Sequence, residues 1–142
     1  PCAILHSSLS NHVTAHRSLY DRVSLTLPAT LDDTLPTNER ILRFTQQESP
    51  ALAALYYNYG RYLLISSTRP GSLPPNLQGL WANGVSTPWN GDYHTNINIQ
   101  MNHWPLEQAG LSELYQPLTT LMERLIPSGE AMAMRQMAGC ST

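Results

Sequence analysis

Polar and indole side chains are concentrated in one stretch of the sequence, residues 81–104. Hydroxyl-rich ligands need paired hydrogen-bond donors and acceptors, which amide side chains supply. Flat indole faces cover the apolar C–H surface of a pyranose ring. The combination therefore indicates a sugar-binding site. Its candidate members are Trp81, Trp89, Trp104, Asp92, His94, His103, Asn96, Asn98, Gln100 and Asn102.

The same residues also have a purely structural interpretation. Tryptophans in loops often pack beneath them as anchors, and polar runs cap helices and turns. We interpret His103 as a surface or packing residue. Asp92 is the only carboxylate near the amides, whereas ordinary glycosidases need two carboxyl groups. The residue types thus predict sugar binding but decide neither a reaction nor its stereochemistry.

Composition narrows the class of protein. The chain has 142 residues, 42% of them hydrophobic, which suffices for one buried core. Its net charge is -2, with no lysine, and its arginines are spread along the chain, so we expect no nucleic-acid partner. No stretch approaches the about 18 apolar residues of a membrane span, and neither cysteine has a metal-like neighbourhood. We therefore expect a globular protein that needs no membrane, metal or cofactor.

The elements that must position these side chains are predicted to be helices. Ser49 and Pro50 are a cap residue and a first-turn proline, and they predict a helix that continues to about Ser67. Its apolar residues recur every three or four positions and form one broad face, which is more typical of core than of a cofactor site. A second such face predicts a helix over residues 111–124, stopped by Pro127, and a last helical segment covers residues 130–137. The first face consists of Leu52, Leu55, Tyr56, Tyr59, Tyr62 and Leu63.

The remaining segments are less regular. Residues 9–23 predict a polar helix, residues 23–27 a short half-buried strand, and residues 29–38 a linker or long loop. Residues 69–95 are rich in proline and glycine and predict a long loop, a kind of segment that tends to be functional. Residues 96–102 alternate polar and apolar side chains, which taken alone predicts a strand.

Several runs of the sequence resemble one family of enzymes. They are residues 60–71 (GRYLLISSTRPG), 75–81 (PNLQGLW), 88–89 (PW) and 92–105 (DYHTNINIQMNHWP). Together they closely resemble glycoside hydrolase family 95, with the likeness extending over residues 49–135. The resemblance implies an all-α fold, a fragment of an (α/α)6 toroid. Residues 1–48 would be the linker before the catalytic domain, and residues 49–142 its truncated N-terminal part.

The resemblance also implies a structure and a chemistry for residues 94–104. The Asn-Ile-Asn run at residues 96–98 would be an irregular segment that leads into a barrel helix, in place of the strand. The reaction would be hydrolysis of terminal α-1,2-linked L-fucose in glycans with inversion. A glutamic acid protonates the leaving oxygen in such enzymes, and two asparagines, matched here by Asn96 and Asn98, hold the attacking water with help from an aspartate. The expected sugar contacts are His94, Trp89, Trp81 and Trp104.

Neither the acid nor the aspartate has a match before residue 142, so we expect this fragment to be inactive by itself. His94 favours L-fucose, because family members resembling L-galactosidases tend to carry threonine there, yet the two sugars differ by one hydroxyl. An α-L-galactosidase therefore stays open as an alternative.

Two other hypotheses lie outside catalysis. The first is a non-catalytic sugar-binding remnant, and the second, a helical interaction module, fits the polar residues 81–104 less well. A fucosylated oligosaccharide is the expected partner. A chain that starts at Pro1 is expected to have lost its natural beginning, so the compartment stays open, and a secreted or periplasmic full-length protein fits.

Overall fold

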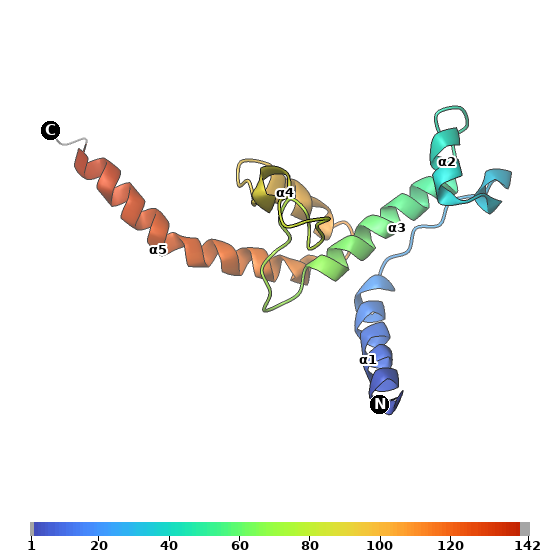
Figure 1. Cartoon of the computed structure of the whole chain (residues 1–142), viewed down its shortest axis with the longest axis horizontal. Helices are drawn as coiled ribbons and strands as arrows, with labels where there is room; N and C mark the ends of the chain where they lie inside the picture. The colour runs from blue at the N-terminus through green and yellow to red at the C-terminus, as the bar shows by residue number, and fades with distance from the viewer. Residues whose placement is uncertain (1, 140–142) are drawn as a thin grey trace. The chain divides into compact units, whose positions relative to one another are not determined.

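The computed structural model describes residues 2–139. All the regular elements that it contains in this range are helices, and loops connect them. The chain divides into two compact units, Pro1–Ser66 with Gln108–Leu111 and Ser67–Glu107 with Ser112–Thr142. In chain order (Figure 1) the elements are α1 (Cys2–Tyr20), η1 (Leu31–Thr34), α2 (Thr37–Arg43), α3 (Pro50–Ser67), η2 (Pro88–Gly91), α4 (Asn98–His103), η3 (Trp104–Leu106), η4 (Ser112–Tyr115) and α5 (Gln116–Gly139). The prediction of an all-α chain is confirmed.

Helix α3 begins and ends where the sequence predicts. The side-chain oxygen of Ser49 accepts a hydrogen bond from the backbone N–H of Leu52 (3.1 Å) and so satisfies one of the donors left free at a helix start. Pro50 takes the first helical position, where its missing N–H costs nothing. Two adjacent residues therefore fix this end of the helix.

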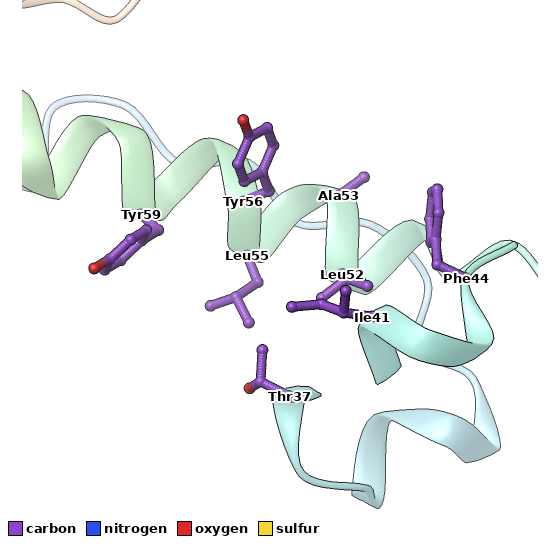
Figure 2. Close-up of a pocket in the computed structure, with 8 residues that line it drawn as sticks. All are labelled: Thr37, Ile41, Phe44, Leu52, Ala53, Leu55, Tyr56 and Tyr59. Carbon is purple, nitrogen blue, oxygen red and sulfur yellow. The ribbon is translucent and has the colours of Figure 1, made fainter. Parts of the chain in front are cut away.

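The apolar face of α3 remains partly uncovered within the first unit. Tyr56, Tyr59 and Tyr62 are exposed, so the described residues do not bury the stripe that was expected to form core. Figure 2 shows Thr37 and Ile41 of α2 facing this side of α3 across an apolar hollow of about 760 Å³. The hollow is lined by Thr37, Ile41, Phe44, Leu52, Ala53, Leu55, Tyr56 and Tyr59. The two helices thus meet loosely.

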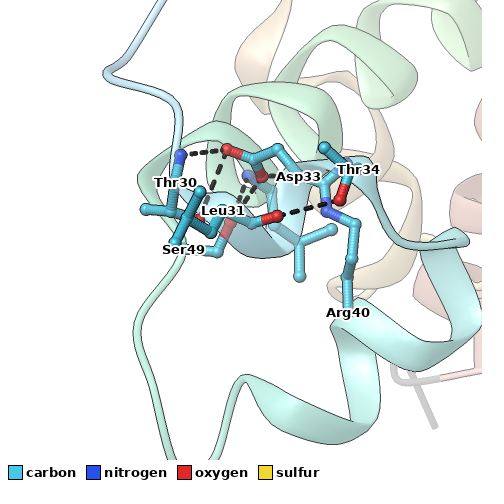
Figure 3. Close-up of polar contacts among 7 residues, drawn as sticks. Thr30, Leu31, Asp33, Thr34, Arg40 and Ser49 are labelled. Atoms are coloured by element: carbon cyan, nitrogen blue, oxygen red, sulfur yellow. Dashed lines mark hydrogen bonds and ion pairs between the residues drawn. The ribbon is translucent and has the colours of Figure 1, made fainter.

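The carboxylate of Asp33 joins η1, α2 and the start of α3 (Figure 3). It accepts hydrogen bonds from the backbone N–H and the hydroxyl of Thr30, from the guanidinium of Arg40, and from the hydroxyl of Ser49 (3.1 Å). The bond from the Thr30 backbone is the main cause that lowers the pKa of Asp33; Ser49 and the charge of Arg40 act in the same direction, against desolvation. The carboxylate is therefore the form of Asp33 that the fold favours.

A buried guanidinium organises the other end of the first unit. Arg61 of α3 is only 2% exposed. It donates to four backbone carbonyls, those of Leu19 (3.3 Å), Tyr20 (2.9 Å), Val23 (2.6 Å) and Ala109 (3.3 Å), and it lies 5.0 Å from the centre of the Tyr20 ring. Two of these carbonyls end α1, where a helix leaves its last acceptors unpaired. Arg61 thus attaches α3 to the end of α1 and to the segment around Ala109.

Residues 23–27 do not form the expected strand. Their alternation is real, since Val23, Leu25 and Leu27 are half-buried and the residues between them are exposed. A strand also needs a neighbour whose backbone can pair with it. Here side chains take that role, because Arg61 donates to the carbonyl of Val23 and Asn58 donates to the carbonyl of Leu25 (3.2 Å).

The remaining helices differ from the predictions in extent. The polar helix expected over residues 9–23 is α1, which spans Cys2–Tyr20. The expected linker at residues 29–38 contains η1 and the first two residues of α2. The predicted stop at Pro127 is wrong, because α5 continues through it. Proline removes one intrahelical hydrogen bond, and residues 122–138 are all exposed, so water can hydrate the carbonyl that loses its partner.

Arg61→Met keeps an unbranched apolar stem and removes the guanidinium. We expect the free energy of unfolding of the chain to fall by roughly 2–4 kcal/mol, because a buried carbonyl without a donor costs about 1–3 kcal/mol. Urea unfolding followed by far-UV circular dichroism measures the change. The matched control is Arg135→Met at an exposed position of α5, which should shift stability by less than about 0.5 kcal/mol. Equal stability of the two variants would contradict the role of Arg61.

Asp33→Asn tests the carboxylate at the junction of η1, α2 and α3. Because the pKa of Asp33 is lowered in the folded chain, its charge stabilises the fold above the unfolded value of about 3.9, and this contribution is lost as pH falls through the folded value. Wild type should therefore melt at a higher temperature than Asp33→Asn at pH 6, and the gap should narrow below about pH 4. Thermal melts between pH 6 and pH 2.5 measure it. A gap that does not change with pH would mean that the charge is irrelevant.

Candidate functional site

The proline- and glycine-rich loop of the second unit is organised by a tight turn at residues 76–79. The carbonyl of Asn76 accepts the backbone N–H of Gly79 (2.9 Å), and the side-chain oxygen of Asn76 accepts the N–H of Gln78 (2.8 Å). Gly79 has a φ of +67°, which a residue with a side chain adopts only under strain. The N–H of Trp81 then donates to the carbonyl of Gln78 (3.2 Å). The turn therefore determines where the chain carrying Trp81 leaves it.

The turn is also bound to the segment before His94. The backbone N–H of Leu77 donates to the carbonyl of Asp92 (3.2 Å), and the hydroxyl of Tyr93 donates to the carbonyl of Pro74 (3.1 Å). Burial raises the pKa of Tyr93, which keeps this hydroxyl a donor. A Cβ on Gly91 would lie 3.4 Å from the side-chain nitrogen of Asn76. Residues 74–77 and 91–93 thus approach each other closely, and Gly91 has no side chain to prevent this.

Helix α4 follows the loop and carries part of the predicted site. Residues 95–97 form a turn, and α4 begins at Asn98. The strand that the alternation alone would predict is absent, and the irregular segment implied by the family resemblance is observed. Ile99 is buried, and the side chain of Gln100 donates to the carbonyl of Thr95 (2.7 Å). Local polar contacts of this kind compete with a strand and favour the turn.

Three residues of the loop have a backbone conformation that non-glycine residues rarely adopt. Trp89, Asn90 and His94 have φ values of +50°, +56° and +48°. Each such conformation costs about 1–3 kcal/mol, and such positions cluster at functional sites. Two of the three are predicted sugar contacts. The strain therefore falls on the part of the loop that the sequence assigned to ligand binding.

The indole side chains are not buried anchors. Trp81, Trp89 and Trp104 are 48%, 70% and 62% exposed. An anchor that packs beneath a loop would be largely buried, so these side chains are not buried anchors within the described residues. Their rings are available to cover a sugar.

The predicted polar residues are brought together only in part. His94 lies next to Asp92, with 3.9 Å between its Nε2 and the carboxylate. Asn96 is exposed and Asn98 half-buried, and neither side-chain amide makes a hydrogen bond to another described residue. Both amides are therefore free to bind a ligand or a water molecule. Within residues 2–139, the amides of Asn96 and Asn98 make no hydrogen bond to any of the three tryptophans.

His103 is a packing residue, one of the two roles expected for it. It is 1% exposed, its Nδ1–H donates to the carbonyl of Ile99 (2.8 Å), and its ring stacks on that of Tyr115 at 6.2 Å between centres. The Tyr115 hydroxyl donates to the carbonyl of His103 (3.0 Å). Burial lowers the pKa of His103, with the bond to Ile99 opposing it, so the neutral ring is favoured.

Sequence reasoning missed the residues that organise the loop. Asn76 and Gly79 make the turn, and Asn102 donates its side-chain N–H to the carbonyl of Asn76 (3.1 Å). Asparagine and glycine three residues apart are a turn signal that could have been recognised. The bond between Asn102 and Asn76 could not have been recognised from the sequence, because 26 residues separate them.

The described part of the chain contains neither a metal-binding cluster nor a membrane-spanning helix. Among the described side chains, those of residues 7–31 and 33–138, no three His, Cys, Asp or Glu groups lie close enough together to hold a metal ion, and Cys2 and Cys140 are outside these ranges. None of the described helices is long and apolar enough to cross a membrane.

Gly79→Ala tests the packing of Trp81 on the turn. A Cβ at this position would lie 3.0 Å from Cε3 of Trp81, and the backbone is left-handed. We expect a loss of roughly 1–2 kcal/mol in stability, with a change in tryptophan emission as the ring is displaced. The control is Gly84→Ala in the same loop, where the nearest atom is 4.0 Å away. If both variants match the wild type in melting temperature and emission, the described turn is wrong.

The chain was also compared with known proteins. It matches the glycosyl hydrolase family 95 catalytic domain over residues 5–142. It is 48% identical to Probable alpha-fucosidase A of Aspergillus niger over 126 residues, which are 87% of this chain and 16% of that protein. It is 39% identical to Alpha-L-fucosidase 2 of Arabidopsis thaliana over 129 residues, 87% of this chain and 15% of that one.

A second Aspergillus protein shows the same pattern. Probable alpha-fucosidase A of Aspergillus oryzae is 40% identical over 119 residues, 81% of this chain and 16% of the relative. The chain thus spans only 15% to 16% of the length of the relatives it matches. Because the match to the catalytic domain extends over nearly all of its residues, the chain belongs to glycosyl hydrolase family 95.

Proposed function

We propose that this segment forms part of the active site of an inverting α-L-fucosidase that removes terminal α-1,2-linked L-fucose from glycans. The match to the family's catalytic domain over residues 5–142 carries the proposal, and three relatives bear the name of α-fucosidases. Exposed indoles and unpaired amides within residues 81–104 support it, because a sugar needs both. Within this match, which begins at residue 5, we further propose that residues 1–48 are a linker region that leads into the toroid and that residues 49–142 are the first part of the toroid.

Asn96 and Asn98 hold the attacking water in this proposal. A neutral amide is a poor base but a good orienting acceptor, and it needs a nearby carboxylate to accommodate the charge that develops. The only described carboxylate close in sequence is Asp92, which lies beside His94. The family resemblance implies that the general acid and the water-activating aspartate come from other parts of a polypeptide of the relatives' length. The 142-residue chain by itself should release no fucose from 2′-fucosyllactose.

His94 and the three tryptophans contact the sugar. His94 is half-buried, its backbone conformation is strained, and its Nε2 lies 3.9 Å from the carboxylate of Asp92, a contact that favours one orientation of the ring. A fixed imidazole discriminates among sugar hydroxyls better than a mobile one, because a mismatched hydroxyl leaves it unpaired. Trp81, Trp89 and Trp104 supply exposed faces for the apolar side of a pyranose.

Asn98→Ala, made in a polypeptide of the relatives' length that carries this segment, should lower kcat by about 10²–10³ while KM changes little. An interaction made mainly in the transition state affects kcat and kcat/KM together, whereas one made equally to the bound sugar raises KM. His94→Ala should therefore express much of its effect in KM. Initial rates of fucose release from 2′-fucosyllactose separate the two patterns.

Several results would count against the proposal. If Asn98→Ala kept the wild-type kcat and only weakened binding, Asn98 would be a sugar ligand and not a water-positioning residue. Proton NMR of the wild-type reaction should show β-L-fucose as the first product, and α-L-fucose would exclude inversion. Preference for an L-galactoside over the matching L-fucoside would replace the proposed substrate with that of an α-L-galactosidase.

A further inference from the structure

We infer that Asn102 is a positioning residue for this active site: its side-chain amide fixes α4, and with it Asn98, against the turn at residues 76–79. The inference rests on the proposed role of Asn98. Nδ2 of Asn102 donates to the carbonyl of Asn76 at 3.1 Å, and both residues are half-buried. Asn98 and Asn102 are four residues apart on α4, so they lie on the same side of the helix.

The carbonyl that Asn102 binds is part of a fixed structure. It also accepts the N–H of Gly79 (2.9 Å), and the next residue, Leu77, donates its N–H to the carbonyl of Asp92 (3.2 Å). The turn is therefore tied forward to the chain that carries Trp81 and across to the chain that carries His94. A hydrogen bond from α4 to this carbonyl sets the helix relative to both.

The other polar contacts at the start of helix α4 are local. Ile97 provides no side-chain cap, the N–H of Ile99 reaches the carbonyl of His94 at 3.4 Å, and the side chain of Gln100 donates to the carbonyl of Thr95 (2.7 Å). Both acceptors lie within five residues of their donors, so neither bond joins the six-residue helix to the turn at residues 76–79. The hydroxyl of Tyr115 reaches the far end, at the carbonyl of His103. Asn98 lies about 6 Å along the helix axis from Asn102, at 1.5 Å per residue. A small rotation about the far end would therefore move the amide of Asn98.

Asn102→Asp is the most direct test, because it keeps the shape and replaces the donor N–H by an oxygen. At pH 7 two acceptors would face each other, and kcat for fucose release should fall by about 10–100-fold with little change in KM, since a displacement of about 1 Å can cost 10²-fold. A protonated aspartic acid can donate again, so activity relative to wild type should recover as pH falls toward 4. Asn102→Leu should show the same loss at pH 7 without the recovery.

Asn58→Asp is the matched control for stability. Asn58 makes the same kind of bond, from Nδ2 to the carbonyl of Leu25 at 3.2 Å, in the first unit. Its substitution should lower the melting temperature and leave kcat per folded molecule unchanged. If Asn102→Asp behaves like Asn58→Asp, or keeps wild-type kcat at pH 7, the inference is overturned.

Hydrogen exchange separates this inference from the proposed function. In the same polypeptide, the peptide containing residues 76–81 should lose protection in Asn102→Asp at pH 7 and keep it in Asn58→Asp. Unchanged protection of this peptide would overturn the tie whatever the activity shows. A different outcome is that the wild-type polypeptide releases no fucose while Asn102→Asp still loses protection. That result would refute the proposed function and overturn the catalytic part of the inference. The hydrogen bond between Asn102 and the turn would nevertheless be established.

Discussion

The backbone carbonyl of Asn76 is the point on which the arrangement of the candidate site depends. A long loop without regular structure must still pair its polar backbone groups, and this loop does so with few bonds. Gly79 closes the turn on that carbonyl, and Asn102 reaches it from α4. The neighbouring bond from Leu77 to Asp92 adds the segment that leads to His94. The segments that carry His94 and Asn98 are thereby held to the turn at residues 76–79 by hydrogen bonds to backbone carbonyls.

Those parts of the fold that depend on local signals could be predicted from the sequence. Ser49 and Pro50 start α3 through contacts within one turn, so its bounds were correct. Residues 23–27 show the limit of a local pattern, because alternation places side chains correctly but cannot supply a partner strand. The partner is instead Arg61, a long-range contact that no periodicity reveals. This buried guanidinium is stabilised by four backbone carbonyls and by the Tyr20 ring, which the fold must place around it.

The candidate site divides in the same way. The chemical types of the side chains could be recognised from the sequence, and the exposure of Trp81, Trp89 and Trp104 agrees with a binding role. The left-handed backbone at Trp89 and His94 could not be predicted, since bulky residues disfavour it and only the surrounding contacts impose it. The role of Asn102 was likewise hidden, because it depends on a partner 26 residues away.

The central claim is that this segment brings two asparagine amides to the water that attacks the sugar. The most direct measurement is a crystal structure, with a non-hydrolysable α-L-fucoside bound, of a polypeptide of the relatives' length that carries this segment. The account predicts an ordered water on the β face of the anomeric carbon, within about 3 Å of a side-chain oxygen of Asn96 or Asn98. It also predicts an indole of the loop against the apolar face of the ring. A fucoside bound elsewhere, with both asparagines beyond hydrogen-bonding distance of any water near that carbon, would contradict the claim.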